Sequence, residues 1–233
     1  MYNSYLKEIL NDQDFKNLVQ SNFCKSSFAQ FGEDLLVNKI LSKITFGNFL
    51  DLGSFHPVHF SNTFLLYLRG WRGVNIDGNK ELIEISKKVR PLDKNIFRFL
   101  SDKEGESFYI KNKKLPALNR VSRDIKNLGN NENYIKIHTS LLNETIREEG
   151  EFLKKLFYLN IDLEFNDEAI LRGFDFKNFH PLLITIESHK FNFYSENRIC
   201  KFLKKYNYSL YSFINPTAFY IDNDFKKNDF HLG

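Results

Sequence analysis

Several features that would define a protein class are scarce in this sequence. Only two cysteines occur in 233 residues, Cys24 and Cys200, and without CxxC spacing they argue against a zinc knuckle or a disulfide scaffold. No apolar run reaches transmembrane length. The acids Glu8, Asp12 and Asp14 stand among the N-terminal apolar residues and are untypical of a signal peptide. We therefore expect a cytoplasmic protein with no membrane span.

Concentrated positive charge is lacking as well. The chain has 33 Lys and Arg against 29 Asp and Glu, and its lysines are scattered. Because a nucleic-acid surface usually needs a basic stripe, we expect no nucleic-acid partner. Hydrophobic residues are plentiful, at 42% of the chain with 25 phenylalanines, which is enough for a sizeable core. This length fits one domain, so residues 1–233 are predicted to form a single domain.

The most informative stretch is 46–79. A short apolar run ends at Asp51 and Gly53, residues 61–69 have helical character, and a second β-type run ends at Asp77. This is the plan of a nucleoside-binding βαβ unit, in which glycine lets a ligand approach the backbone and the last carboxylate can accept ribose hydroxyls. A dinucleotide fingerprint has three glycines, so NAD and FAD are disfavoured. A buried strand whose Asp51 and Gly53 only shape a turn remains the alternative.

Strands and helices alternate along the rest of the chain, which predicts an α/β fold. We expect N-terminal helices in residues 1–45 and a core in 46–222, with an inserted polar loop at about 111–133. The two last strands should form an antiparallel pair, so the sheet should be mostly parallel with one antiparallel strand. Further helices are predicted at 2–23, from 27 to about 44, and at 81–89, 141–151, 168–172 and 199–206. Further strands are predicted at 95–100, 107–110, 135–139, 157–161, 182–186, 208–214 and 218–221.

Four of the predicted strands end in an acid. Ligands of open parallel sheets bind at the carboxyl ends of the strands, so these carboxylates should converge on one crevice. One of them, Asp77, would accept both ribose hydroxyls, and Asp102 could accept from the exocyclic amine of adenine. Asn62 and Thr63 would offer hydrogen-bond donors at the start of a helix. The four acids are Asp51, Asp77, Asp102 and Asp162.

Five segments carry a family resemblance: QFGED at 30–34, FLDLGSFHPVHFSNT at 49–63, RGWRGVNIDGN at 69–79, LSDKEGE at 100–106 and NIDLEFNDEAIL at 160–171. Together they resemble the FkbM-type family of S-adenosylmethionine (SAM)-dependent methyltransferases. The resemblance runs from about Ser27 to Asp222. It implies a class I, Rossmann-like fold with a seven-stranded sheet and helices on both faces. It also implies SAM as methyl donor, S-adenosylhomocysteine (SAH) as product and a hydroxyl acceptor, usually on a sugar or secondary metabolite.

Two details of the resemblance concern the acceptor. The HP…SNT form of the first motif suggests a nucleotide sugar or a capsule-type surface polysaccharide. The family's acid-x-acid-glycine is Asp162-Leu163-Glu164-Phe165 here, with phenylalanine in place of glycine. The predicted cofactor-binding residues are Gln30, Asp51, Gly53, Ser54, Asn62, Thr63, Asp77, Gly78, Ser101, Asp102 and Asp162.

Methylation of a hydroxyl requires loss of its proton, so a base is expected beside the cofactor. We favour His189, oriented by Asp162 or Glu187. Alternatively, Asp162 with Glu187 or His189 could hold a divalent cation such as Mg²⁺ or Mn²⁺, which would lower the pKa of the hydroxyl. The predicted catalytic residues are His189, Asp162, Glu164 and His59.

An O-methyltransferase acting on a sugar or nucleotide sugar is thus the leading hypothesis. An N-methyltransferase acting on a small amine or amide is the second. A non-catalytic partner subunit with the SAM fold is suggested only by Phe165. An RNA methyltransferase is disfavoured by the absence of a basic patch. The sequence leaves the acceptor, the metal dependence and a homo-oligomeric state open.

Overall fold

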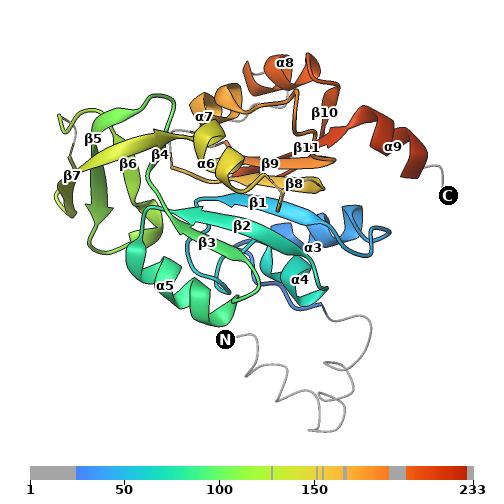
Figure 1. Cartoon of the computed structure of the whole chain (residues 1–233), viewed down its shortest axis with the longest axis horizontal. Coiled ribbons are helices and arrows are strands. Elements are labelled where there is room, and N and C mark those ends of the chain that lie inside the picture. Colours follow the sequence, from blue (N-terminus) through green and yellow to red (C-terminus); the bar gives the residue numbers. More distant parts are fainter. Residues whose placement is uncertain are drawn as a thin grey trace, which may run out of the picture.

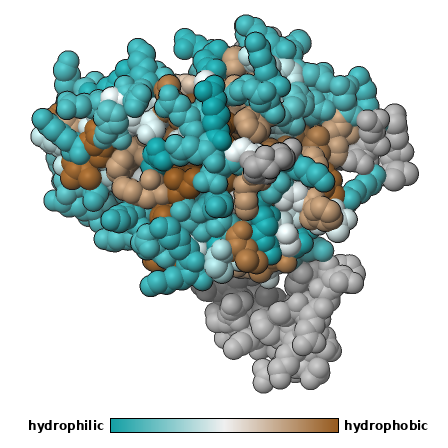
Figure 2. Space-filling model, viewed as in Figure 1, coloured by the Kyte–Doolittle hydropathy of each residue, from teal (hydrophilic) through white to brown (hydrophobic). Residues whose placement is uncertain are grey.

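The computed structural model describes residues 25–126, 128–150, 152–153, 155–164, 167–188 and 198–229. A seven-stranded sheet runs through the centre with helices on both faces, and a smaller four-stranded sheet lies at one end (Figure 1). The helix predicted for 2–23 lies outside the described residues, as do Phe165 and His189. Hydrophilic residues dominate the face seen in Figure 2, with hydrophobic residues in patches among them. Among the described helices, none combines the length and the apolar character needed to cross a membrane.

The seven strands are arranged in the order β10-β11-β9-β8-β1-β2-β3. The predicted α/β fold is therefore confirmed, but the sheet is mixed rather than mostly parallel. β11 is antiparallel to both of its neighbours, because the Asn215-Pro216 turn reverses the chain after β10, whereas the four other pairings are parallel. The strands are β1 Asn48–Leu52, β2 Arg72–Asp77, β3 Lys94–Phe97, β8 Leu156–Ile161, β9 Leu183–Glu187, β10 Tyr208–Ile214 and β11 Thr217–Asp222.

The central strands are apolar on both faces, as expected of strands covered by helices on each side. In β1, Leu50 and Leu52 belong to the hydrophobic cluster that contains residues of α6, α7 and α8. Phe49 between them belongs to a second cluster with residues of α3 and α4. Because successive side chains of a strand point to opposite faces, β1 supplies both halves of the core. The helices are α3 Glu33–Ile40, α4 Phe64–Leu68, α5 Lys80–Val89, α6 Leu142–Glu148, α7 Asp167–Gly173, α8 Arg198–Lys204 and α9 Asn223–Asp229.

The helix predicted from residue 27 begins later, at Glu33. Gly32 precedes it in the left-handed conformation, with φ of 89°, which interrupts any helix running through it. The carboxylates of the first turn bond the chain before it: Glu33 accepts the N–H of Phe31 at 2.7 Å, and Asp34 accepts the N–H of Phe28 at 2.7 Å. Glu33 and Asp34 therefore fix the conformation of the segment that precedes α3.

The polar segment 111–133, predicted to be a loop, contributes short strand segments to the second sheet, and most of its described residues lie outside the strands. It contains the 3₁₀ turn η1 Pro116–Leu118, the strand β6 Arg120–Ser122 and the start of β7. Pairing with β5 supplies backbone hydrogen bonds that do not depend on hydrophobic side chains, and Arg120 forms a bidentate ion pair with Glu132. The sheet order is β4-β7-β5-β6, with β4 Leu100–Ser101, β5 Gly105–Asn112 and β7 Glu132–Leu141.

Candidate active site

A cleft lies between the carboxyl ends of the central strands and the small sheet. Asp51, Asp77 and Asp162, at or just after the ends of β1, β2 and β8, line it together with Glu187 at the end of β9. The small sheet contributes Tyr109 of β5, Arg120 of β6 and residues of η1. Three of the four acids predicted to converge therefore do so.

Asp77 is held by the backbone on both carboxylate oxygens. The N–H of Phe55 donates to Oδ2 at 2.8 Å, and that of Asn79 donates to Oδ1 at 2.6 Å. Burial raises the pKa of Asp77 to about 6, although the two N–H donors act in the opposite direction. Its two oxygens retain lone pairs for further donors, as the hydroxyls of a ribose would require.

Two aromatic rings close over the backbone that follows Asp77. A Cβ at Gly78 would lie 2.7 Å from the ring of Phe99 and 3.3 Å from that of Tyr109, so only glycine lets these rings pack so close. The two ring centroids are 4.9 Å apart. A carboxylate for ribose beside aromatic rings for a base is chemically suited to the adenosine part of SAM.

Asp51 forms part of a buried polar network on the cleft floor. Thr63 Oγ1 donates to its Oδ2 at 2.7 Å and Asn160 Nδ2 donates to its Oδ1 at 2.8 Å. Arg90, itself buried and paired with Asp93 at 2.8 Å, donates to Thr63 Oγ1 at 3.0 Å. Burial raises the pKa of Asp51, while the two hydrogen bonds and the charge of Arg90 oppose the rise. The network fixes the position of this carboxylate on the cleft floor.

Gly53 allows β1 and β8 to approach each other at the cleft. Its φ is 79°, and its N–H donates to the carbonyl of Ile76 at 2.9 Å. A Cβ at this position would lie only 1.7 Å from the carbonyl oxygen of Asp162. The close contact between two backbones explains the single glycine of the first motif in structural terms.

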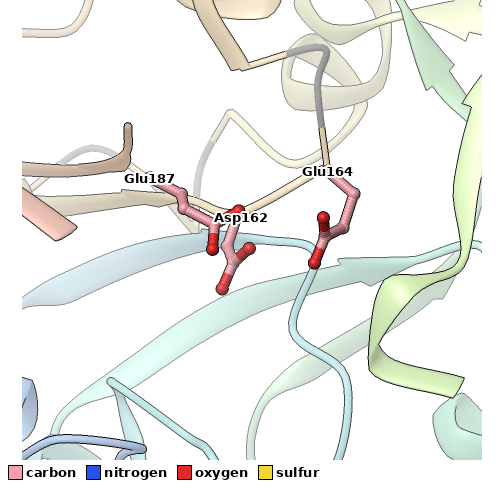
Figure 3. A group of neighbouring side chains, drawn as sticks. All are labelled: Asp162, Glu164 and Glu187. Carbon is pink, nitrogen blue, oxygen red and sulfur yellow. The ribbon is translucent and has the colours of Figure 1, made fainter. Parts of the chain in front are cut away.

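Three carboxyl groups gather where β8 and β9 end (Figure 3). Oxygens of Asp162, Glu164 and Glu187 lie within 4.8 Å of one another. Burial is the main cause that raises the pKa of all three, to about 7 for Glu164 and about 8 for Glu187, and neighbouring carboxylates raise them further. A hydrogen bond to Asp162 acts in the opposite direction on the pKa of Glu187, and such a bond requires a proton on one of the two carboxyl groups. When deprotonated, an all-oxygen set of this kind suits Mg²⁺ or Mn²⁺.

The structure separates the predicted site residues into two groups. Those that line the cleft are Gln30, Asp51, Gly53, Ser54, Asn62, Asp77, Gly78, Asp162 and Glu164. Thr63 lies behind Asp51, as described above. Ser101 and Asp102 are not part of the lining, although Leu100, the first residue of β4, is. Asp102 instead pairs with Arg123 at 2.8 Å.

Of the predicted histidines, His59 is not among the residues that line the cleft. His59 is exposed, and its ring lies 4.6 Å from that of His56. His56 Nδ1 accepts the N–H groups of Val58 and His59, so it shapes the loop after β1. His189 lies outside the described residues, and its role as a base stays a prediction.

Several lining residues were missed by sequence reasoning. Asn160 precedes Asp162 by two residues, and the period of a strand places both on one face, so a signal existed. Tyr109 and Arg120 had no such signal, because the docking of the small sheet against the large one brings them to the cleft. Phe55 and Phe60 were part of a recognised motif but were not read as lining residues.

The fold and the cleft together define an α/β protein whose cleft at the carboxyl edge of the sheet is chemically suited to a nucleoside. The family model described as "Methyltransferase FkbM domain" matches residues 48–210, more than two thirds of the chain. The chain therefore belongs to the FkbM methyltransferase family and is a SAM-dependent methyltransferase. No curated protein and no solved structure matches it.

Proposed function

We propose that this methyltransferase acts on a hydroxyl of a sugar or nucleotide sugar, in the cytoplasmic synthesis of a capsule-type surface polysaccharide. The observation that carries the proposal is the carboxyl cluster of Asp162, Glu164 and Glu187 in the same cleft as Asp77. A neutral hydroxyl is a weak nucleophile, and groups that can take up a proton or hold a cation beside the donor meet that need. The sugar follows from the family resemblance of residues 49–63.

The residues of the cleft divide into a donor side and an acceptor side. Bound SAM supplies a methyl group on a positively charged sulfur. Asp77 would accept the ribose hydroxyls, and Phe99 and Tyr109 would contact the adenine. Asp51 would offer its negative charge to the cationic part of the donor. Gly53 would keep the carboxyl ends of β1 and β8 close together beside the donor.

Residues on the acceptor side of the cleft would remove the proton of the acceptor's hydroxyl. As the bond from the methyl carbon to the acceptor oxygen forms and the bond to sulfur breaks, the hydroxyl proton passes to a base. His189 remains our first choice because it follows Glu187 by two residues. Glu164 and Glu187 are the carboxylate candidates, since pKa values of about 7 and about 8 leave them poised to exchange protons near neutral pH. The alternative is a divalent cation on the carboxyl cluster that lowers the pKa of the hydroxyl.

The test is turnover of SAM with a panel of nucleotide sugars, followed by mass spectrometry of the products. His189→Ala, Glu164→Gln and Glu187→Gln are compared with His138→Ala, a matched change on an exposed residue of β7. Loss of the base should reduce kcat by about 10²–10⁴-fold with SAH binding intact. A cation would be indicated instead if EDTA abolished activity and Mg²⁺ restored it.

Other outcomes would reject the proposal. Methylation of amines and of no sugar hydroxyl would favour the N-methyltransferase. SAH binding without turnover of any acceptor would favour a non-catalytic partner subunit.

A further inference from the structure

The loop between β1 and α4 holds two phenylalanines in a conformation that bulky residues rarely adopt. Phe55 has φ of 48° and Phe60 has φ of 60°, both in the left-handed region. In that region Cβ crowds the following carbonyl oxygen, so a side chain as large as phenylalanine is an outlier there. Such conformations persist only where the surroundings enforce them, and they cluster at functional sites.

Hydrogen bonds on both sides enforce this loop. The N–H of Phe55 is bound to Asp77, the ribose acid of the proposed donor side, at 2.8 Å. At the other end, the N–H of Ser61 donates to the carbonyl of Phe28 at 3.0 Å. Between them, His56 Nδ1 accepts two N–H groups of the loop at 3.0 and 3.1 Å. The backbone of the loop that carries both aromatic residues is thus held by hydrogen bonds within the protein itself.

The result is a stacked aromatic pair in the cleft wall. The rings of Phe55 and Phe60 have centroids 6.2 Å apart and planes inclined by 23°, and both residues line the cleft. Phe60 remains 55% exposed, so it is not a core residue. Polar and charged residues, including Asn62, Arg120 and Glu164, line the same cleft. A fixed, exposed aromatic ring among such groups offers a flat apolar surface to a ligand that is otherwise polar.

We propose that Phe60, supported by Phe55, is the surface on which the acceptor's sugar ring stacks. A pyranose has hydroxyls around its edge and a face of C–H groups, and the negative face of an aromatic ring attracts those hydrogens. The hydroxyls then remain free to face the carboxyl groups. This proposal rests on the proposed function for the class of acceptor. The adenine of SAM is a less suitable occupant, because Phe99 and Tyr109 already provide rings beside Asp77.

The experiment compares Phe60→Ala and Phe60→Trp with Phe46→Ala. Phe46 is a suitable control because it is 65% exposed and precedes β1, whereas the cleft lies beyond the carboxyl end of that strand. Binding of UDP-glucose, UDP-galactose, UDP-N-acetylglucosamine and GDP-mannose to the SAH-loaded full chain is measured by saturation-transfer NMR. SAH affinity is measured by calorimetry. Phe60→Ala should weaken sugar binding about tenfold with unchanged SAH affinity, while Phe60→Trp and Phe46→Ala bind as the wild type does.

Three results would overturn the inference. Phe60→Ala could bind the sugars as tightly as the wild type, or it could lose SAH affinity instead, which would assign the ring to the donor. The wild type could also bind none of the four sugars. A wild type that binds a sugar through Phe60 but transfers no methyl group to it would reject the proposed function and leave the stacking surface standing.

Discussion

Replacing Gly53 by alanine should damage both the fold and the cleft, and the structure separates two causes of the damage. The first is conformational: φ is 79°, and an L-residue in the left-handed region costs about 1–2 kcal/mol. The second is steric, because the new Cβ would lie 1.7 Å from the carbonyl oxygen of Asp162. Backbone cannot rotate away as a side chain can, so β1 and β8 must move apart, which adds about 1–3 kcal/mol. The total loss of unfolding free energy is then about 2–5 kcal/mol.

Gly70 offers a control for the first cause alone. Its φ is 92°, and a Cβ there would meet no atom within 4 Å. Gly70→Ala should therefore cost only about 1–2 kcal/mol, a fall in Tm of about 2–8 °C at this chain length. Urea unfolding of both variants measures the difference, and calorimetry should show weaker SAH binding for Gly53→Ala only. The reasoning is refuted if Gly53→Ala is no less stable than Gly70→Ala.

Three further predictions concern the acids of the cleft and their partners. Asp77→Ala should lose about 1.5–3 kcal/mol of SAH binding free energy in calorimetry, whereas Asp102→Ala, outside the cleft, should lose none. Equal losses would contradict the assignment of Asp77 to the ribose of the donor. Thr63→Val removes the hydroxyl that bonds Asp51 and should lower the unfolding free energy by about 1–3 kcal/mol in urea, so an unchanged value would count against the network. Glu187 has a folded pKa of about 8, above its unfolded value, so its stabilising contribution is complete at low pH and is lost as pH rises through about 8. Glu187→Gln should flatten the fall in stability between about pH 5 and 9, and an unaltered slope would show that another group titrates.

The donor side of the cleft was predictable because its signals are local. Asp51, Gly53 and Asp77 each stand where a short apolar run ends, and a parallel βαβ unit places the ends of its two strands side by side. The structure pairs β1 with β2 in this way, with Asp51 opposite Asn75. Local patterns also predicted the helix α5. It begins after Asn79, and the side chain of Asn79 accepts N–H groups of its first turn.

The wall of the cleft formed by the small sheet was not predictable because it depends on pairing between distant, polar segments. In β5 and β7, Lys111 pairs with Asn133, and neither residue type favours a strand. Without that sheet in view, Tyr109 and Arg120 had no reason to face the cleft. The position of Asp102 was predicted wrongly for the same reason, because no residue near Phe97 indicates that the chain passes there from the large sheet to the small one.

The segment that forms the small sheet begins and ends at neighbouring positions in the structure. All four of its strands come from one uninterrupted stretch, 100–141, and the two ends of that stretch are paired in parallel, with Leu100 opposite Ser140. A segment whose ends lie side by side can be exchanged without displacing the strands around it. The segment 100–141, which carries Tyr109 and Arg120, could therefore be exchanged as one unit. Asp51 and Asp77, by contrast, lie in strands of the large sheet. In an engineered relative that keeps the ring of Tyr109, a transplanted segment would present new groups to acceptors and leave the donor's position unaltered.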